Sequence, residues 1–345
     1  MGILAVPAVK LLIRETSKAI ASAEMRGLVA LNEFQREEVT YWRFLDDWQR
    51  SLPWREEKHC RISLSTDASN YSWGCVIHQL SGDLKMGDYW NNEQKELFIS
   101  SKEMLALVHA IRALPEEIRD ARVDACVDSK VMIGAWEGQG GKTSLQLIRV
   151  TKQLFREVSS RNIQISLQYV ESDKNKVEAP SRRLSRTDSK LSAEAFVAVD
   201  HAFGGVTGHS FDLMALDSNA VMRKDGKPLP HFTPHPSPCS AGVNLFCQDL
   251  TRITEMPNPY VFSPFGLIGP VLKFLLPFRI PFTIVVPEFI PPPYWWPELM
   301  SRSIHTHCLG KRGDKHVLLS PSKFGYMPVA CPAIMWACRV GRFSQ

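Results

Sequence analysis

The sequence predicts an α/β protein in which a mixed five-stranded sheet with flanking helices is followed by a second α/β domain. From Arg61 onward apolar and polar residues alternate, and the same alternation recurs in WGCVIHQ and near KMGDYW, which is typical of an antiparallel meander. Two more strand-like runs follow, RVDACVD and IQISLQYV, with helical spacing before each. The order βββαβ, a helical segment and a fifth strand predicts a mixed sheet.

Two amphipathic helices are expected ahead of this sheet. Residues 8–24 and 31–49 carry apolar side chains at helical spacing, such as Leu12 and Trp42. Pro53 closes this helical region. The sequence therefore predicts a helical segment that precedes the first strand.

Two further helices are expected within the sheet domain. Residues 99–113 form an apolar face from Met104, Leu107, Val108 and Ile111. Ser100 or Ser101 is available as the N-cap of this helix. The face of a longer helix consists of Leu145, Ile148, Phe155 and Val158.

A basic segment, residues 174–190, ends the first globular region and places a domain boundary near residue 190. Beyond it the chain is rich in proline and aromatic residues. The most apolar stretch, residues 271–290, is interrupted by Lys273, Arg279 and prolines, so it is expected to form buried strands joined by proline turns rather than a membrane span.

Composition sets broad limits on the class of protein. The chain has 345 residues, a formal net charge of +5 and eight cysteines without a CxxC pair. This pattern argues against a disulfide framework or a four-cysteine zinc site and favours a reducing compartment. We expect an intracellular protein, cytoplasmic or nuclear, with no signal peptide and no transmembrane segment.

Four acidic residues occupy positions where they can converge. Asp67 and Asp128 end the first and fourth predicted strands, Glu103 lies near the start of a helix, and Glu178 follows the fifth strand. If the first and fourth strands are neighbours, their terminal acids meet at one edge of the sheet. Such a cluster predicts divalent metal, namely two Mg²⁺ ions about 4 Å apart that act on a phosphodiester.

The motifs that carry these acids have a known counterpart. TDAS with a following WG, then ISSKEMLAL, VDSK and NKVEAPSR resemble the ribonuclease H domain of a reverse transcriptase in order and spacing. More narrowly, the chain resembles the polyprotein of DIRS-type retrotransposons, in which a helical connection region such as EVTYWRFLDDW precedes that domain. The resemblance implies a connection region at 1–58, a ribonuclease H-like domain at 59–186 and a degenerate methyltransferase-like domain at 194–330.

The resemblance also implies a function for the acids. They would be the catalytic and metal-binding residues of an enzyme that hydrolyses the RNA strand of an RNA/DNA hybrid with two Mg²⁺ ions, for which Mn²⁺ can substitute: Asp67, Glu103, Asp128 and Glu178. Glu178 stands where the family has Asp, which moves the carboxylate by a methylene. The expected partners are the RNA/DNA hybrid and an upstream polymerase half, with no membrane.

Further residues are expected to touch nucleic acid, namely Ser69, Trp73, Asn175, Arg182 and Arg183. Two alternatives stay open at this point. Trp73 lies beside Gly in a strand, where a core position competes with stacking on a base. The arginines belong to the basic segment, which either follows phosphates or is a solvated linker.

The second domain is similar in layout to phage-type adenine N6-methyltransferases, through FDLMALDSNA and YVFSPF. Active members carry Asn or Asp before Pro-Pro and an aromatic residue, whereas this chain has Phe262-Ser263-Pro264-Phe265, so we do not expect methyl transfer. GQGGKTS is rejected as a phosphate loop because Trp136 stands where Gly is required. The alternative function for the whole chain is a catalytically decayed nucleic-acid-binding or scaffold remnant.

Overall fold

The computed structural model describes residues 2–23, 28, 30–45, 60–139, 144–175, 177, 187–223, 225–251 and 257–341. The chain divides into two compact units. The first consists of Met1–Ala68, Cys75–Leu84 and Leu97–Glu178, and the second of Ser69–Gly74, Lys85–Glu96 and Ala179–Gln345. Most of β3 (Leu84–Tyr89) and the start of β2 (Ser72–His78) are thereby assigned to the second unit, although both strands belong to the first sheet.

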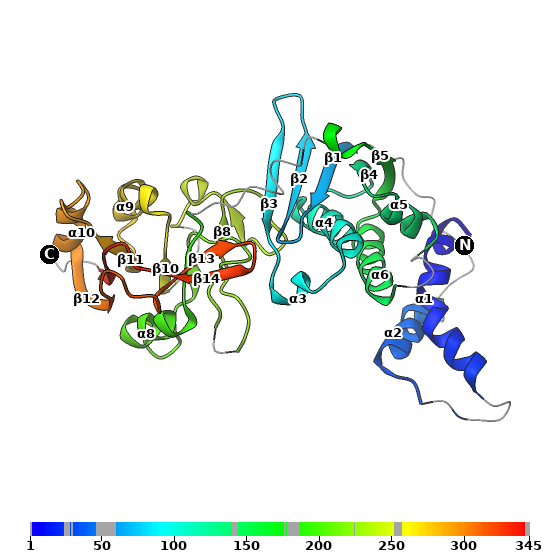
Figure 1. Cartoon of the computed structure of the whole chain (residues 1–345), viewed down its shortest axis with the longest axis horizontal. Coiled ribbons are helices and arrows are strands. Elements are labelled where there is room, and N and C mark those ends of the chain that lie inside the picture. Colours follow the sequence, from blue (N-terminus) through cyan, green and yellow to red (C-terminus); the bar gives the residue numbers. More distant parts are fainter. Residues whose placement is uncertain are drawn as a thin grey trace. The chain divides into compact units, whose positions relative to one another are not determined.

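The first sheet has five strands in the order β3-β2-β1-β4-β5 (Figure 1). The strands are β1 (Cys60–Ala68), β2 (Ser72–His78), β3 (Leu84–Tyr89), β4 (Ala121–Val127) and β5 (Gln164–Tyr169). Short connections make β1, β2 and β3 an antiparallel meander, whereas β4 runs parallel to both β1 and β5. The predicted mixed five-stranded sheet is confirmed.

Helices flank this sheet, and two of them, α4 and α6, form where the sequence predicts helices. They are α3 (Asn92–Lys95), α4 (Ile99–Ala113), α5 (Lys130–Glu137), α6 (Leu145–Ser160) and the short η2 (Ser172–Lys174). The four predicted face residues of α4 are fully buried, because this helix packs against both β1 and α6. The expected serine cap is wrong: Phe98 holds the N-cap position, and Ser101 is buried inside the first turn.

The N-terminal helices belong to the first unit. They are α1 (Gly2–Ser22), α2 (Glu33–Tyr41) and the 3-10 turn η1 (Trp42–Leu45). Leu11 and Leu12 of α1 form a buried cluster with Ile148 and Phe155 of α6. The predicted helical region therefore packs on a helix of the sheet domain, while residues 46–59 lie outside the described residues.

A buried ion pair fixes this packing. Lys152 Nζ of α6 lies 2.6 Å from Glu38 Oε1 of α2, and the two side chains are 12% and 2% exposed. Glu38 Oε2 also accepts hydrogen bonds from the backbone N–H and the hydroxyl of Thr16, each at 2.9 Å. Burial acts to raise the pKa of Glu38, but the hydrogen bonds from Lys152 and Thr16 outweigh it and lower the pKa.

Replacing Lys152 by Met is expected to lower the free energy of unfolding by about 2 kcal/mol, because the Glu38 carboxylate stays buried without its cation. Urea unfolding of the full chain at neutral pH measures this loss. Since the pKa of Glu38 is lowered on folding, the stabilisation is present at neutral pH and disappears as the pH falls through the folded pKa. The matched control is Lys174→Met. The Lys174 side chain is 69% exposed, and its ion pair with Glu171 contributes well under 1 kcal/mol to the free energy of unfolding. Equal effects of both substitutions would contradict this assignment.

The second unit contains a sheet in the order β12-β15-β11-β10-β7 (Figure 1). Its strands are β7 (Phe211–Asp212), β10 (Pro259–Val261), β11 (Phe282–Glu288), β12 (Ser303–Gly310) and β15 (Ile334–Val340). β7, β10 and β11 are parallel, and β15 is antiparallel to both β11 and β12. The predicted second α/β domain is confirmed as an α/β fold, and β15 lies beyond its predicted end at residue 330.

Smaller elements complete the unit. The helices are α8 (Ala193–Phe203), α9 (Ile268–Leu275) and α10 (Trp296–Arg302), with the 3-10 turns η3 (Leu245–Cys247), η4 (Phe265–Leu267) and η5 (Leu276–Phe278). A short sheet joins β14 (Gly325–Val329), β13 (Leu318–Ser322) and β6 (Lys190–Leu191), and β8 (Phe232–Thr233) pairs in parallel with β9 (Gly242–Val243).

The core of the second unit has two layers, one on each face of its sheet. Ile284 and Val286 of β11 pack with the buried side of α9, whereas Val285 packs with α8. The alternation follows from the two-residue period of a strand. No helix in the described part of the chain is long and apolar enough to cross a membrane.

The apolar stretch at 271–290 is only partly the expected set of strands. Its first part is the end of α9, and the strand β11 begins at Phe282. Ile268, Val271, Leu272 and Leu275 are all buried, and their spacing is that of one helical face. The expectation of strands for this part is wrong, because the first proline of the stretch, Pro277, lies after α9 and does not interrupt its helical period.

Candidate functional site

Two of the predicted acids lie side by side at the end of the first sheet. β1 and β4 pair in parallel up to Ser65 and Cys126, and two positions further in the same register stand Asp67 and Asp128. Neighbouring strands are about 5 Å apart. The strand order and register therefore bring together two residues that are distant in the sequence.

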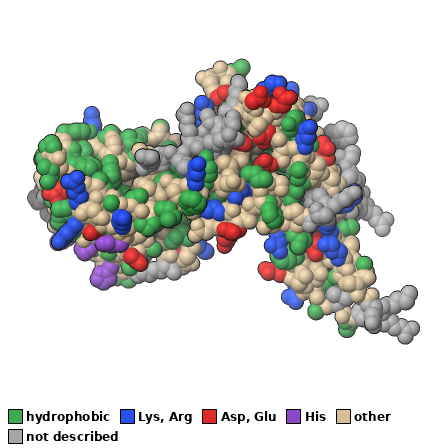
Figure 2. Space-filling model, viewed as in Figure 1, with side chains coloured by type: hydrophobic (Ala, Val, Ile, Leu, Met, Phe, Trp, Pro, Cys, Tyr) green, Lys and Arg blue, Asp and Glu red, His purple; other side chains and the backbone are tan. Residues whose placement is uncertain are grey.

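Glu103 faces the same place from α4. Its carboxyl is half-buried, and its pKa is raised, chiefly by burial. A hydrogen bond with Ser129 lowers this pKa, whereas the negative charges of Asp128 and Asp67 raise it. A carboxylate responds to other charges in this way only at short range. The structure thus brings three of the four predicted acids into one electrostatic cluster. Figure 2 shows Asp and Glu side chains interspersed with Lys and Arg side chains on the surface of the first unit.

Two serines that the sequence analysis did not select contact these acids. Ser129 is the N-cap of α5, where its hydroxyl accepts from the backbone N–H of Met132 at 3.3 Å, and it also bonds Glu103. Ser172 of η2 donates its hydroxyl to Asp128 Oδ2 at 2.8 Å. The role of Ser129 could be recognised in the sequence, because a serine between a strand-end acid and a helix is a typical N-cap.

The chemistry of this cluster fits a hard divalent cation. All three side chains offer carboxylate oxygens, the ligands that Mg²⁺ prefers, and their mutual repulsion favours a compensating charge. As they are placed, no three His, Cys, Asp or Glu side chains among the described residues form a metal-holding group, and Glu103 and Asp128 are engaged by the hydroxyls of Ser129 and Ser172. The fourth predicted acid, Glu178, lies outside the described residues.

Two residues that were expected to bind nucleic acid, Trp73 and Ser69, make structural contacts within the protein instead. Trp73 is only 2% exposed, because both faces of β2 are covered, so its prediction as a stacking residue is wrong and the core alternative holds. The Ser69 hydroxyl forms hydrogen bonds with the backbone of Ser72 across the turn between β1 and β2. The backbone carbonyl of Ser69 accepts a hydrogen bond from Trp90 Nε1 at 2.9 Å. The structure gives Ser69 a turn-closing role.

Asn175 is also a structural residue. It is 6% exposed, its Nδ2 donates to the Thr66 carbonyl at 3.1 Å, and its Oδ1 accepts from the Val177 N–H at 3.3 Å. These bonds attach the chain after η2 to β1, next to Asp67. The expectation that Asn175 touches nucleic acid is therefore wrong for this buried side chain, while Arg182 and Arg183 lie outside the described residues.

The first unit thus combines a mixed five-stranded sheet with three acids at one of its ends, and the second unit is a separate α/β fold. No family model matches the sequence, and no curated protein matches it. The structure is similar to that of LC11-RNase H1, solved in complex with an RNA/DNA hybrid, with 19% identity, a TM-score of 0.29, and coverage of 33% of this chain and 88% of that chain.

Two further solved structures illustrate the range of similarity. RNase H1 from the halophilic archaeon Halobacterium salinarum NRC-1 is 19% identical, with a TM-score of 0.29 and coverage of 33% of this chain and 89% of that chain. The protease–reverse transcriptase of prototype foamy virus is 13% identical, with a TM-score of 0.24 and coverage of 55% of this chain and 27% of that chain. The match to the archaeal protein spans most of that protein, and the match to the viral protein spans about a quarter of it.

Proposed function

We propose that the first unit is a nuclease that hydrolyses the RNA strand of an RNA/DNA hybrid. The observation that carries this proposal is the convergence of Asp67, Glu103 and Asp128 at one end of the mixed sheet, where burial and then the charges of the two aspartates raise the pKa of Glu103. Three acids at the edge of a rigid sheet are suited to phosphodiester chemistry, because they hold cations at a fixed place.

In this proposal each acid has a distinct task. Asp67 and Asp128 come from paired strands, so their separation is set by the register of β1 and β4. Glu103 approaches from α4, and Glu178 is proposed as the fourth acid. When bound, two Mg²⁺ ions, or Mn²⁺ in their place, supply Lewis acidity at the scissile phosphate and lower the pKa of the attacking water.

The neighbouring polar residues position these acids. Ser172 and Ser129 hold the carboxylates of Asp128 and Glu103 by hydrogen bonds, which limits their rotation. Asn175 attaches the following chain to β1. In this proposal the carboxylates of Asp67, Glu103 and Asp128 would hold the cations, and Ser129 and Ser172 would orient two of these carboxylates.

We further propose that the chain derives from a DIRS-type retrotransposon polyprotein. In this proposal the chain consists of a helical connection region at 1–58, a ribonuclease H-like domain at 59–186 and a degenerate methyltransferase-like α/β domain at 194–330. The helices α1 and α2 ahead of the first sheet and the α/β fold of the second unit support this order. An upstream polymerase half would then be its partner. Co-purification of the chain with such a half, through the α1–α2 region, would test the partnership.

The rival function is a decayed module that binds nucleic acid or serves as a scaffold without cleavage. A specific observation favours it: the three acids, as placed, do not form a metal-holding group among the described residues. Glu178 in the place of Asp points the same way. Binding and cleavage therefore have to be measured separately.

The test uses the full chain with a hybrid labelled on its RNA strand. We expect Mg²⁺-dependent cleavage of that strand, with no cleavage of the same RNA when single-stranded or of the corresponding DNA duplex. Addition of a chelator should stop the reaction. Tight hybrid binding without cleavage at any Mg²⁺ or Mn²⁺ concentration would support the scaffold, and neither binding nor cleavage would overturn both functions.

A further inference from the structure

A proline-rich segment of the second unit connects β11 to α10 (Figure 1). Residues 291–294, which read PPPY and are named the PPPY segment, follow Ile290 in this connection. Ile290 and Tyr294 are 94% and 82% exposed, and Pro291 and Pro292 between them are also exposed. Exposed loops that carry large apolar side chains are favoured places for binding another protein.

Both ends of the connection are fixed to the core of the second unit. On the N-terminal side, Phe289 packs edge-on against Phe265, with ring centroids 5.9 Å apart. On the C-terminal side, Trp295 is 6% exposed and belongs to the same buried cluster as the residues of α9. The Trp296 N–H donates to the Pro293 carbonyl at 3.0 Å. The segment is therefore held in place before a partner binds, which lowers the entropy cost of binding.

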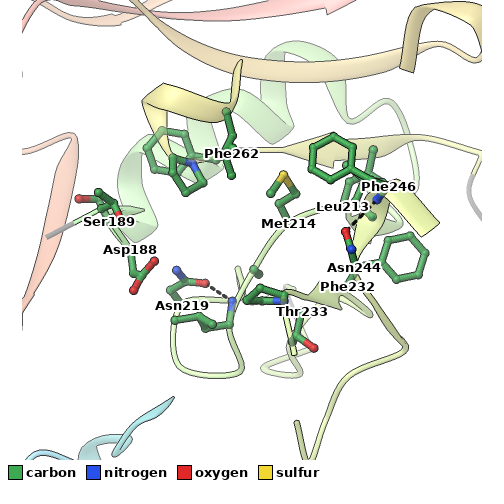
Figure 3. A pocket seen from close by; sticks show the side chains of 17 residues that line it. Asp188, Ser189, Leu213, Met214, Asn219, Phe232, Thr233, Asn244, Phe246 and Phe262 are labelled. Carbon is green, nitrogen blue, oxygen red and sulfur yellow. Dashed lines mark hydrogen bonds between the residues drawn. The ribbon is translucent and has the colours of Figure 1, made fainter. Parts of the chain in front are cut away.

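The N-terminal anchor continues into the interior of the unit. Phe265 also packs edge-on against Phe262, with ring centroids 6.2 Å apart. Phe262 in turn lines a cavity of about 390 Å³ at the carboxyl ends of β7, β8, β9 and β10 (Figure 3). None of residues 290–294, all of which the structure describes, lines this cavity. A partner would thus contact the PPPY segment from the solvent side.

The chemistry of the PPPY segment defines the kind of partner. Consecutive prolines favour the polyproline II conformation, whose φ angles are fixed by the proline rings. Modules with a groove lined by aromatic side chains bind such segments, because the prolines lose little conformational entropy on binding. Pro291 and Pro292 followed at the second position by Tyr294 form the pattern Pro-Pro-x-Tyr, which is the pattern that WW-type modules bind.

The other common class of proline-binding module is not matched by this part of the chain. SH3-type modules bind PxxP, in which two prolines are three positions apart. The prolines of this region stand at positions 287, 291, 292, 293 and 297. No two of them have that separation, so the sequence favours the WW class over the SH3 class.

Tyr294 is available to a partner. Its hydroxyl lies so close to Gly269 of α9 that any side chain at that position would clash with it. This contact covers only the end of the side chain, since the residue is 82% exposed. A rotation about the side-chain torsions of Tyr294 is sufficient to bring the ring into the pocket of a partner.

From these features we infer that the PPPY segment is a docking site for a WW-type module of a partner protein. Pro291 and Pro292 lie in the aromatic groove of the module, and the ring of Tyr294 fills the adjoining pocket. The site consists of residues of the second unit and does not involve the acids of the first. Its occupancy is therefore independent of the proposed nuclease function.

Isothermal titration of the full chain with a purified WW module of the class that binds Pro-Pro-x-Tyr peptides tests the inference. We expect binding of one module per chain with a dissociation constant of about 100 µM or tighter. A purified SH3 module, titrated in the same way, should not bind. A synthetic peptide of residues 288–298 verifies that the WW module recognises the isolated segment. If the full chain did not bind the WW module, whether or not the peptide did, the inference would be overturned.

Variants locate the binding site. Pro292→Ala and Tyr294→Ala should each weaken binding of the WW module by at least about tenfold. Their controls are Pro328→Ala and Phe324→Ala, which change an exposed proline and an exposed aromatic residue elsewhere in the same unit and should leave binding unchanged. Thermal melting verifies that each variant is folded. Binding that is insensitive to both substitutions in the PPPY segment would place the module elsewhere and refute the inference.

Discussion

Asp67→Asn is expected to slow hybrid cleavage by about a thousandfold, with hybrid binding changed by no more than a few fold. Asparagine has the same shape as aspartate but lacks the negative charge that holds a cation. Asp67 lies in β1 and is 7% exposed, so the neutral variant also removes repulsion from the cluster and should fold. The measurement is the single-turnover rate of RNA-strand cleavage at saturating Mg²⁺.

The matched control for this substitution is Asp83→Asn. Asp83 lies between β2 and β3, is partly exposed and contacts His78 at 3.1 Å, so it carries the same change of charge away from the cluster. Its cleavage rate should equal that of the unaltered chain. If Asp67→Asn cleaved as fast as Asp83→Asn, the acids could not be the catalytic centre, and the scaffold function would take its place.

The second large effect concerns pH and Asp88, a buried carboxyl of the second unit. Its oxygens accept from the Ser218 N–H at 2.9 Å, the Ser218 hydroxyl at 2.5 Å and the Tyr89 N–H at 2.6 Å. Burial nevertheless dominates and raises the pKa of Asp88 from 3.8 to about 7. The folded unit therefore binds the Asp88 proton more tightly than the unfolded chain does.

The raised pKa of Asp88 predicts that stability falls as the pH rises. The favourable contribution is complete below about pH 4 and is lost between pH 4 and pH 7, and a shift of this size corresponds to about 4 kcal/mol. Asp88→Asn should remove this dependence. Urea unfolding from pH 4 to pH 8 measures it as the difference between the unaltered chain and the variant, whatever the absolute stability of the variant.

Asp225→Asn is the control for the pH series, because Asp225 is exposed and should leave the dependence unchanged. If Asp88→Asn kept the same pH dependence of stability as the unaltered chain, Asp88 would have an ordinary pKa in the folded unit. This result would also show that the hydrogen bonds from Ser218 and Tyr89 compensate fully for burial.

Much of the fold could be predicted because its information is local. The two-residue period of β1 and the apolar face of α4 depend on the residues within each element, and residues 99–113 form the predicted helix. The same local reading failed for Val271–Leu275, where prolines suggested turns but the buried spacing is helical. It also misplaced the cap of α4, because a buried serine and a capping serine look alike in sequence.

The sequence by itself determined the number and type of the strands of the first sheet and the order in which its acids occur. Only the tertiary structure decided that Asp67, Glu103 and Asp128 meet, that Ser129 and Ser172 hold two of them, and that Trp73 and Asn175 are buried. It also created the cavity of the second unit from four strand ends. The physical reason is that periodicity reports which side of an element is apolar, whereas contacts between distant residues depend on strand pairing and packing.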